Sequence, residues 1–115
     1  MTLIVAVSHN DMCGFGFIML LVIASKPLFS LGKVFLTPAT KAMFSEGILD
    51  VNELINRHIS GDWSDMCDDD IESNKDAIAH GFRVFSSYKL SESQNIWIIT
   101  EADRSCTTLL LPDEY

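Results

Sequence analysis

The chain has 115 residues, of which 48% are hydrophobic and 21% are charged, and its net charge is −8. This composition is typical of one globular domain and excludes a disordered chain. Because an acidic surface repels phosphate groups, the charge also argues against direct binding to DNA or RNA.

Residues 1–25 form an apolar N-terminal extension before a single domain expected for residues 26–115. Residues 12–25 carry no charge, but the apolar run within them is shorter than the ~20 residues that span a bilayer. Three interpretations stay open: an element packed on the domain, a signal peptide or membrane anchor at residues 12–24, and a non-native start. His9 and Asp11 stand where a signal peptide needs basic residues. The uncharged run also favours self-association, so a homo-oligomer is one expected outcome.

A short strand and a short helix are expected next. Residues 33–37 are β-branched and aromatic, which favours a strand. Thr37 and Pro38 then fit the N-cap and the first position of a helix that stops at Gly47. The inner face of this helix is expected to consist of Ala39, Ala42 and Met43.

The strongest helix signal begins at Asp50. This residue is placed as an N-cap, and Glu53 follows three residues later as in a capping box. Apolar residues recur behind it at helical spacing, and His58 lies on or beside that buried stripe. Gly61 suits the left-handed conformation that ends a helix, so the following turn is expected to swing Trp63 back over the core.

A third helix is expected from Asp68 to Gly81, because acidic residues in a first turn complement the helix dipole. The segment around it contains ten acids but only two bases, Arg57 and Lys75. The ten acids are Glu46, Asp50, Glu53, Asp62, Asp65, Asp68, Asp69, Asp70, Glu72 and Asp76. The interaction face expected on this segment consists of Asp62, Trp63, Asp65, Asp68, Asp69, Asp70 and Glu72.

Three strands are expected at residues 82–90, 95–100 and 106–111, joined by loops of hairpin length. They predict an α+β fold: a three-stranded antiparallel meander, with residues 33–37 as an optional fourth strand, covered on one face by two to three short helices. Trp97 alternates with isoleucines, which favours a central position for its strand. The inward residues expected on the first strand are Phe82, Val84 and Tyr88.

Two polar groups raise the question of catalysis. His58 and Asp62 lie at a helix end, and Glu101, Asp103 and Arg104 lie in one loop. A general base needs an orienting partner and a substrate cleft, whereas histidines near helix C-termini are usually packed, and loops are polar in any case. We therefore expect no catalytic residue, and a small enzyme using both groups is an alternative that requires them to meet in one cleft.

The sequence predicts neither a metal site nor a cofactor. Its three cysteines, Cys13, Cys67 and Cys106, are widely spaced and odd in number, which favours a reduced, cytoplasmic compartment. The ligand spacings CxxC, HxxxH and HExxH are missing from the sequence. A dinucleotide fingerprint and a Gly-x-Ser-x-Gly motif are missing as well.

Three stretches, Pro27–Val34, Arg57–Trp63 and Ile98–Tyr115, together resemble a family of small proteins carried by bacterial plasmids and integrated elements. The resemblance covers roughly residues 26–115 and leaves out residues 1–25. Members are labelled plasmid-related protein or type I restriction endonuclease subunit M. The second label implies a DNA methyltransferase, whose glycine motif and Asn/Asp-Pro-Pro-aromatic motif do not occur in this sequence.

These observations lead to one main hypothesis and two alternatives. The main hypothesis is a non-enzymatic accessory protein of a plasmid or mobile element, which binds a protein partner through its acidic helical face. The first alternative is a DNA mimic that inhibits a restriction or other defence enzyme. The second is the small enzyme described above.

Overall fold

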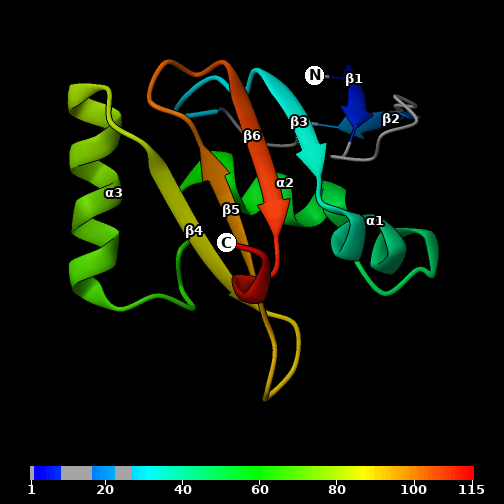
Figure 1. Ribbon diagram of the computed structural model, residues 1–115. Helices are drawn as coiled ribbons and strands as arrows, with labels where there is room; N and C mark the ends of the chain where they lie inside the picture. The colour runs from blue at the N-terminus through cyan, green and yellow to red at the C-terminus, as the bar shows by residue number, and fades with distance from the viewer. Residues whose placement is uncertain (1, 9–16, 23–26) are drawn as a thin grey trace.

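The computed structural model describes residues 2–8, 17–22 and 27–115, with side chains from residue 27 onward. Within these ranges the chain forms a mixed sheet of six strands, three α-helices and a closing 3-10 turn (Figure 1). The elements in chain order are β1 (Thr2–Ser8), β2 (Phe17–Val22), β3 (Lys33–Leu36), α1 (Pro38–Ser45), α2 (Val51–Ser60), α3 (Asp68–His80), β4 (Val84–Lys89), β5 (Asn95–Thr100), β6 (Cys106–Leu110) and η1 (Pro112–Glu114).

The strands follow the order β2-β1-β3-β6-β5-β4 across the sheet. Strands β4, β5 and β6 form the antiparallel meander predicted from the sequence. The fourth strand predicted at residues 33–37 is also present, and it pairs in parallel with β6, with Lys33 opposite Cys106. The α+β prediction is therefore confirmed, and the parallel pair makes the sheet mixed.

Gly32 allows β3 to approach the loop before β6. Its φ is +65°, and a Cβ atom at this position would lie 2.4 Å from the carbonyl oxygens of both Arg104 and Ser105. Because those atoms belong to the main chain, they cannot move aside as a flexible side chain would. Glycine is thus required where the first and last strands of the domain meet.

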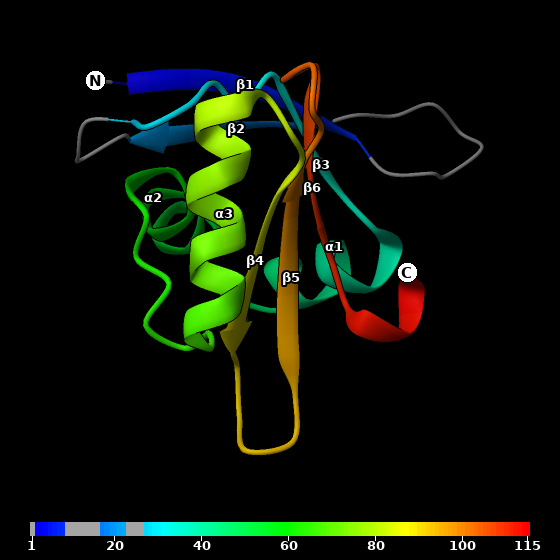
Figure 2. The ribbon, with the colours of Figure 1, turned by 90° about the vertical axis from the view of Figure 1, so that its left-hand side faces the viewer.

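The helices enclose the core on one side of the sheet and along its edge. Figure 2 shows α2 lying against one face, and in Figure 1 α3 runs beside β4. Helix α1 follows the end of β3, and the hydroxyl of its buried Thr40 donates to the Leu109 carbonyl of β6 at 3.0 Å. The most deeply buried core side chains are Val34, Leu36, Val51, Ile55, Ile59, Val84, Tyr88, Ile96, Ile98 and Leu109.

The predicted helix ends are largely confirmed. The Asp50 carboxylate accepts a hydrogen bond from the Glu53 N–H at 3.0 Å, as an N-cap should. Gly61 adopts φ 80° at the end of α2, and Trp63 is only 4% exposed. The three-residue spacing and the glycine were sufficient because both signals are local in sequence.

Two predictions of side-chain direction were wrong. In α1 the predicted inner residue Met43 does pack against the core, but Ala42 is exposed, and the fully buried residue is Thr40, whose hydroxyl donates to a main-chain carbonyl of β6. Phe82 is 59% exposed because β4 begins only at Val84, after the turn that follows α3. The alternating pattern of β4 starts two residues later than the sequence suggested.

Helix α3 covers the outer edge of β4. The side chain of Asn74, which is buried, accepts a hydrogen bond from the Phe85 N–H at 3.0 Å and donates one to the Phe85 carbonyl at 2.5 Å. One amide side chain therefore bonds Phe85 as a neighbouring strand would. This arrangement removes a pair of free main-chain groups from the sheet edge.

The C-terminal residues close the other end of the meander. The Glu114 carboxylate accepts hydrogen bonds from the Leu111 N–H at 2.9 Å and from the Thr37 hydroxyl at 2.6 Å. The Tyr115 ring packs edge-on against Trp97, with centroids 5.7 Å apart, and its hydroxyl accepts a hydrogen bond from Arg83 at 3.1 Å. The tail thereby covers part of the sheet face opposite α2.

Strands β1 and β2 form an antiparallel hairpin that extends the sheet beyond β3 (Figure 1). The three interpretations of residues 1–25 also depend on residues 9–16 and 23–25 and on side chains that lie outside the described part of the chain. Those interpretations stay predictions. No helix in the described ranges combines the length and the apolar character needed to cross a lipid bilayer.

Candidate functional site

His58 lies at the centre of a buried network of hydrogen bonds. Its Nδ1 atom is 2.5 Å from the Ser86 hydroxyl on β4, and its Nε2 atom is 2.8 Å from the Thr100 hydroxyl on β5. The indole N–H of Trp63 donates to the same Ser86 oxygen at 2.8 Å. Both nitrogens of the fully buried ring are therefore occupied by protein groups.

The far end of the network fixes the direction of its hydrogen bonds. The Thr107 hydroxyl donates to the Leu31 carbonyl at 2.7 Å, so it accepts from Thr100, whose oxygen lies 2.7 Å away. Thr100 must then accept from the Nε2–H of His58, and the Nδ1 atom must accept from Ser86. The network is consistent with one neutral tautomer of His58.

The charge state of His58 follows from its surroundings. Burial, with a smaller contribution from the positive charge of Arg104, lowers the pKa of His58 from 6.5 to about 3. The ring is therefore neutral near pH 7, as the hydrogen-bond directions require. The ring has no access to solvent in this structure, and it packs as part of the core.

The turn after α2 holds an ion-pair cluster. Arg57 bonds Asp62 at 3.0 Å, lies 3.7 Å from the Asp65 carboxylate and stacks over the Tyr88 ring at 4.3 Å. Asp65 also accepts a hydrogen bond from the main-chain N–H of Lys89 at 3.1 Å. Partial burial would raise the pKa of Asp62, but the hydrogen bonds it accepts lower the pKa below its usual value.

Arg104 binds the main chain at the end of α3. Its guanidinium donates to the carbonyls of Phe82 at 2.7 Å, Glu101 at 3.1 Å and Ala77 at 3.2 Å. Arg104 itself has φ 59°, a conformation that few residues other than glycine adopt. The side chain satisfies carbonyl groups near a helix C-terminus, where a positive charge is favourable.

The two other polar residues of this loop also have local roles. Glu101 pairs with Arg83 at 3.4 Å on the surface. Asp103 accepts a hydrogen bond from the Ser105 N–H at 3.0 Å, and its hydrogen bonds with Ser105 lower the pKa of Asp103. These contacts hold the loop between β5 and β6 in shape.

The two polar groups considered for catalysis do not meet. The Asp62 and Asp65 cluster reaches β4 at Lys89, whereas Arg104 binds at Phe82, before the strand begins. At ~3.3 Å per residue, the main chain at Lys89 is roughly 20 Å from the main chain at Phe82. Phe29 also separates His58 from Arg104, with its ring centroid 5.0 Å from the imidazole and 5.6 Å from the guanidinium.

The acids of the expected interaction face are exposed, but Trp63 is not. Asp62, Asp65, Asp68, Asp69, Asp70 and Glu72 lie at the surface. Trp63 fills the core and bonds Ser86, so its inclusion in a surface was wrong. The separate prediction that the turn after α2 swings Trp63 back over the core is confirmed.

Sequence reasoning missed the hydroxyls that hold His58, namely those of Ser86, Thr100 and Thr107. Small polar residues on strands usually face water, which is why they attracted no attention. The alternation of side chains along β4 was the available signal. Ser86 stands two residues from both Val84 and Tyr88, which face inward, so its side chain faces inward as well.

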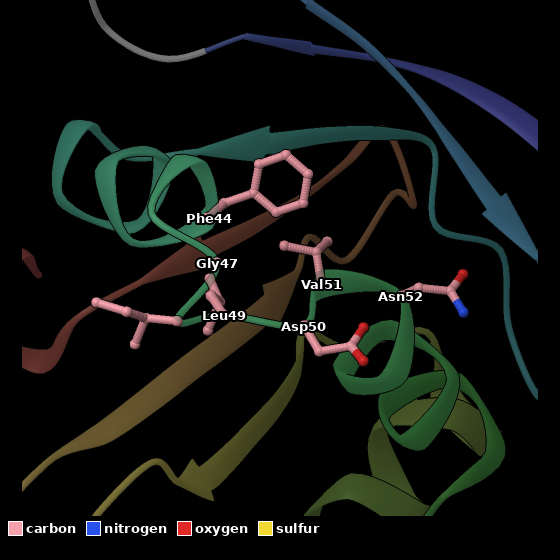
Figure 3. A pocket seen from close by; sticks show the side chains of 7 residues that line it. Phe44, Gly47, Leu49, Asp50, Val51 and Asn52 are labelled. Atoms are coloured by element: carbon pink, nitrogen blue, oxygen red, sulfur yellow. The ribbon is translucent and has the colours of Figure 1, made fainter.

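The hollow beside the loop between α1 and α2 offers little chemistry. Figure 3 shows Phe44 and Val51 approaching each other there, with the Asp50 carboxylate nearby. That carboxylate already caps α2. Among the residues that the structure describes, no three or more His, Cys, Asp or Glu side chains are grouped so that they could hold a metal ion.

Comparisons with protein-family models, with curated proteins and with solved structures found no match to this chain.

Proposed function

We propose that this protein is a non-enzymatic accessory protein that binds a basic surface of a partner protein through the outward face of α3. The observation that carries the proposal is a row of exposed acids at helical spacing. Asp68, Glu72 and Asp76 recur every four residues along α3, with Asp69 beside them.

Apart from the favourable position of Asp68 and Asp69 in the first turn of α3, these acids make few contacts with the other described residues. The basic residue of the same helix, Lys75, pairs with Glu72 at 3.5 Å, and both side chains are largely exposed. In the part of the chain that the structure describes, Asp68, Asp69 and Asp76 take part in no ion pair. Exposed charges of one sign steer a partner of opposite charge and speed its association.

The resemblance to small plasmid and integrated-element proteins supports the setting of this proposal. A protein of that kind would meet its partner in the cytoplasm, either a host protein or one encoded by the same element. The roles found for His58, Asp62, Glu101, Asp103 and Arg104 are structural, which favours binding over catalysis.

The test is capture of partners by the whole protein and by a variant without the acidic row. The variant combines D68N, D69N, E72Q and D76N, and the control variant combines E46Q and E92Q at exposed positions elsewhere. We expect the wild type and the control to retain a basic partner that high salt releases, and the row variant to lose it. Equal capture by all three proteins would contradict the proposal.

A narrower version is imitation of DNA. Acids four residues apart on a helix lie ~6 Å apart along its axis, a regular line of negative charge. A protein of this kind would inhibit a restriction or other defence enzyme in competition with DNA. Duplex DNA should then displace the captured partner, and a partner that binds DNA and this protein at the same time would exclude mimicry.

A further inference from the structure

An apolar groove lies between the end of α2 and the side of α3. Its volume is about 450 Å³, and it is lined by Leu28, Ser60, Gly61, Trp63, Ile71, Lys75 and Ile78. Leu28 is 51% exposed, and Ile71 and Ile78 are only partly buried. The groove therefore presents apolar side chains to solvent beside the acidic row of α3.

The floor of the groove is held firmly. The Leu28 N–H donates to the Ile59 carbonyl at 2.8 Å, which ties the segment before β3 to the end of α2. A Cβ atom at Gly61 would lie 3.0 Å from a Leu28 methyl group and 3.6 Å from the Trp63 ring, so there is little room between these side chains. The hydrogen bond from Trp63 to Ser86 fixes the indole from below. A preformed groove of this kind requires little reorganisation when it binds a ligand.

The wall formed by α3 combines apolar contacts with negative charge. Ile71 and Ile78 are seven residues apart, so they lie on the same side of α3, and both line the groove. Asp68 and Glu72 lie on the neighbouring side of the helix, which faces solvent. Lys75 lies between the two isoleucines, and its charge is paired with Glu72. Among the residues that the structure describes, the one charged residue that lines the groove is therefore Lys75, its charge is offset by Glu72, and the unpaired carboxylate of Asp68 lies one turn earlier in α3.

We propose that this groove receives an amphipathic helix of the partner protein. One large apolar side chain of that helix enters between Leu28 and the isoleucines of α3. Its lysines and arginines lie along the acids of α3 that have no ion pair within the described ranges, Asp68, Asp69 and Asp76. Helices bind grooves in this way through anchors spaced three and four residues apart. The inference rests on the proposed function and specifies the class of partner.

Three synthetic peptides of equal length test the inference. The first has leucines on one helical face and lysines on the other, the second replaces its leucines with alanines, and the third replaces its lysines with glutamates. We expect the first to bind the whole protein at least about tenfold more tightly than either of the others, because it alone combines an apolar anchor with positive charge. Its binding should shift the methyl NMR signals of Leu28, Ile71 and Ile78.

Matched variants locate the binding site. L28S should weaken binding of the first peptide about tenfold, as loss of one buried apolar contact implies. I48S is the control, because Ile48 is 60% exposed beside a different hollow. Far-UV circular dichroism confirms that both variants are folded.

Two outcomes would overturn the inference. If the first two peptides bind equally and the three methyl signals do not move, the acidic row binds basic peptides without the groove, and the proposed function is unaffected. If the first peptide binds at another surface or does not bind, the groove is not its site. The capture experiment with the row variant then decides on the proposed function separately.

Discussion

One neutral histidine connects helix α2 to two strands of the sheet through hydrogen bonds. His58 belongs to α2, and through Ser86 and Thr100 it is bonded to two strands of the sheet. Thr107 extends the same line of hydroxyls to the carbonyl of Leu31 in the segment before β3. Because every polar group in the line has a partner, the network stabilises one arrangement of the core.

The buried position of His58 predicts an acid-sensitive fold. Its pKa is about 3 in the folded protein against 6.5 for a free histidine, so the unfolded chain takes up the proton first as the pH falls. The contribution to stability is complete above pH 6.5 and is lost as the pH falls towards 3. The slope should reach ~1.4 kcal/mol per pH unit in the free energy of unfolding.

Urea unfolding of the wild type and of H58Q across this pH range measures that contribution. The variant should have the smaller slope, because a glutamine at position 58 takes up no proton in this pH range. A wild-type slope equal to that of H58Q would mean that His58 is not kept neutral by the fold.

Ser86 has a larger effect than its size suggests, since it serves both Trp63 and His58. The variant S86A leaves an indole N–H and an imidazole nitrogen without partners in the core. At ~1–3 kcal/mol for each of these two buried unpaired groups, the expected loss is about 2–6 kcal/mol. The neighbour Ser87 faces the other side of β4, so S87A should change the free energy of unfolding little. Similar losses for the two variants would contradict this role of Ser86.

At the scale of helices and strands, local signals were sufficient and distant contacts were not. Asp50 and Gly61 bounded α2 correctly because a cap depends on residues within one turn. The parallel pairing of β3 with β6 could not be predicted, since the two strands share no local pattern. For the same reason, the sequence placed His58 on the buried stripe but did not reveal its partners.

The edge of β4 offers a test at this scale. The variant N74D keeps the acceptor for the Phe85 N–H, but it loses the donor for the Phe85 carbonyl and places a negative charge beside it. The loosened α3 would expose a strand edge, which promotes association between sheets. Sedimentation should show oligomers of N74D and a reduced melting temperature.

The exposed neighbour Ser73, whose hydroxyl bonds one turn back within α3, provides the control. The variant S73A should have the size distribution of the wild type. If N74D also sediments as the wild type does and melts at the same temperature, the bonds of Asn74 to Phe85 do not protect the edge.

For the molecule as a whole, the C-terminal residues 112–115 stabilise the sheet by packing on Trp97 and bonding Thr37. Removal of residues 112–115 would expose Trp97 and break the bonds of Glu114 to Thr37 and to the Leu111 N–H. We expect a loss of about 1–3 kcal/mol in stability. Tryptophan fluorescence should move to longer wavelength as the indole of Trp97 meets water.

A single substitution separates the ring contact of Tyr115 from its hydrogen bond to Arg83. The variant Y115F keeps the ring against Trp97 but loses the surface bond to Arg83, so its emission should match that of the wild type. A truncated chain that melts and fluoresces as the intact protein does would show that the tail contributes nothing to the fold.

The pairing of β3 with β6 also affects how the protein is made. On the ribosome β3 emerges early, and its partner β6 appears only after all three helices and two further strands have been synthesised. The apolar face of β3 must therefore wait without its final neighbour while the middle of the chain folds. A nascent chain in this state would need a chaperone or rapid translation, since unpaired strands are prone to aggregate.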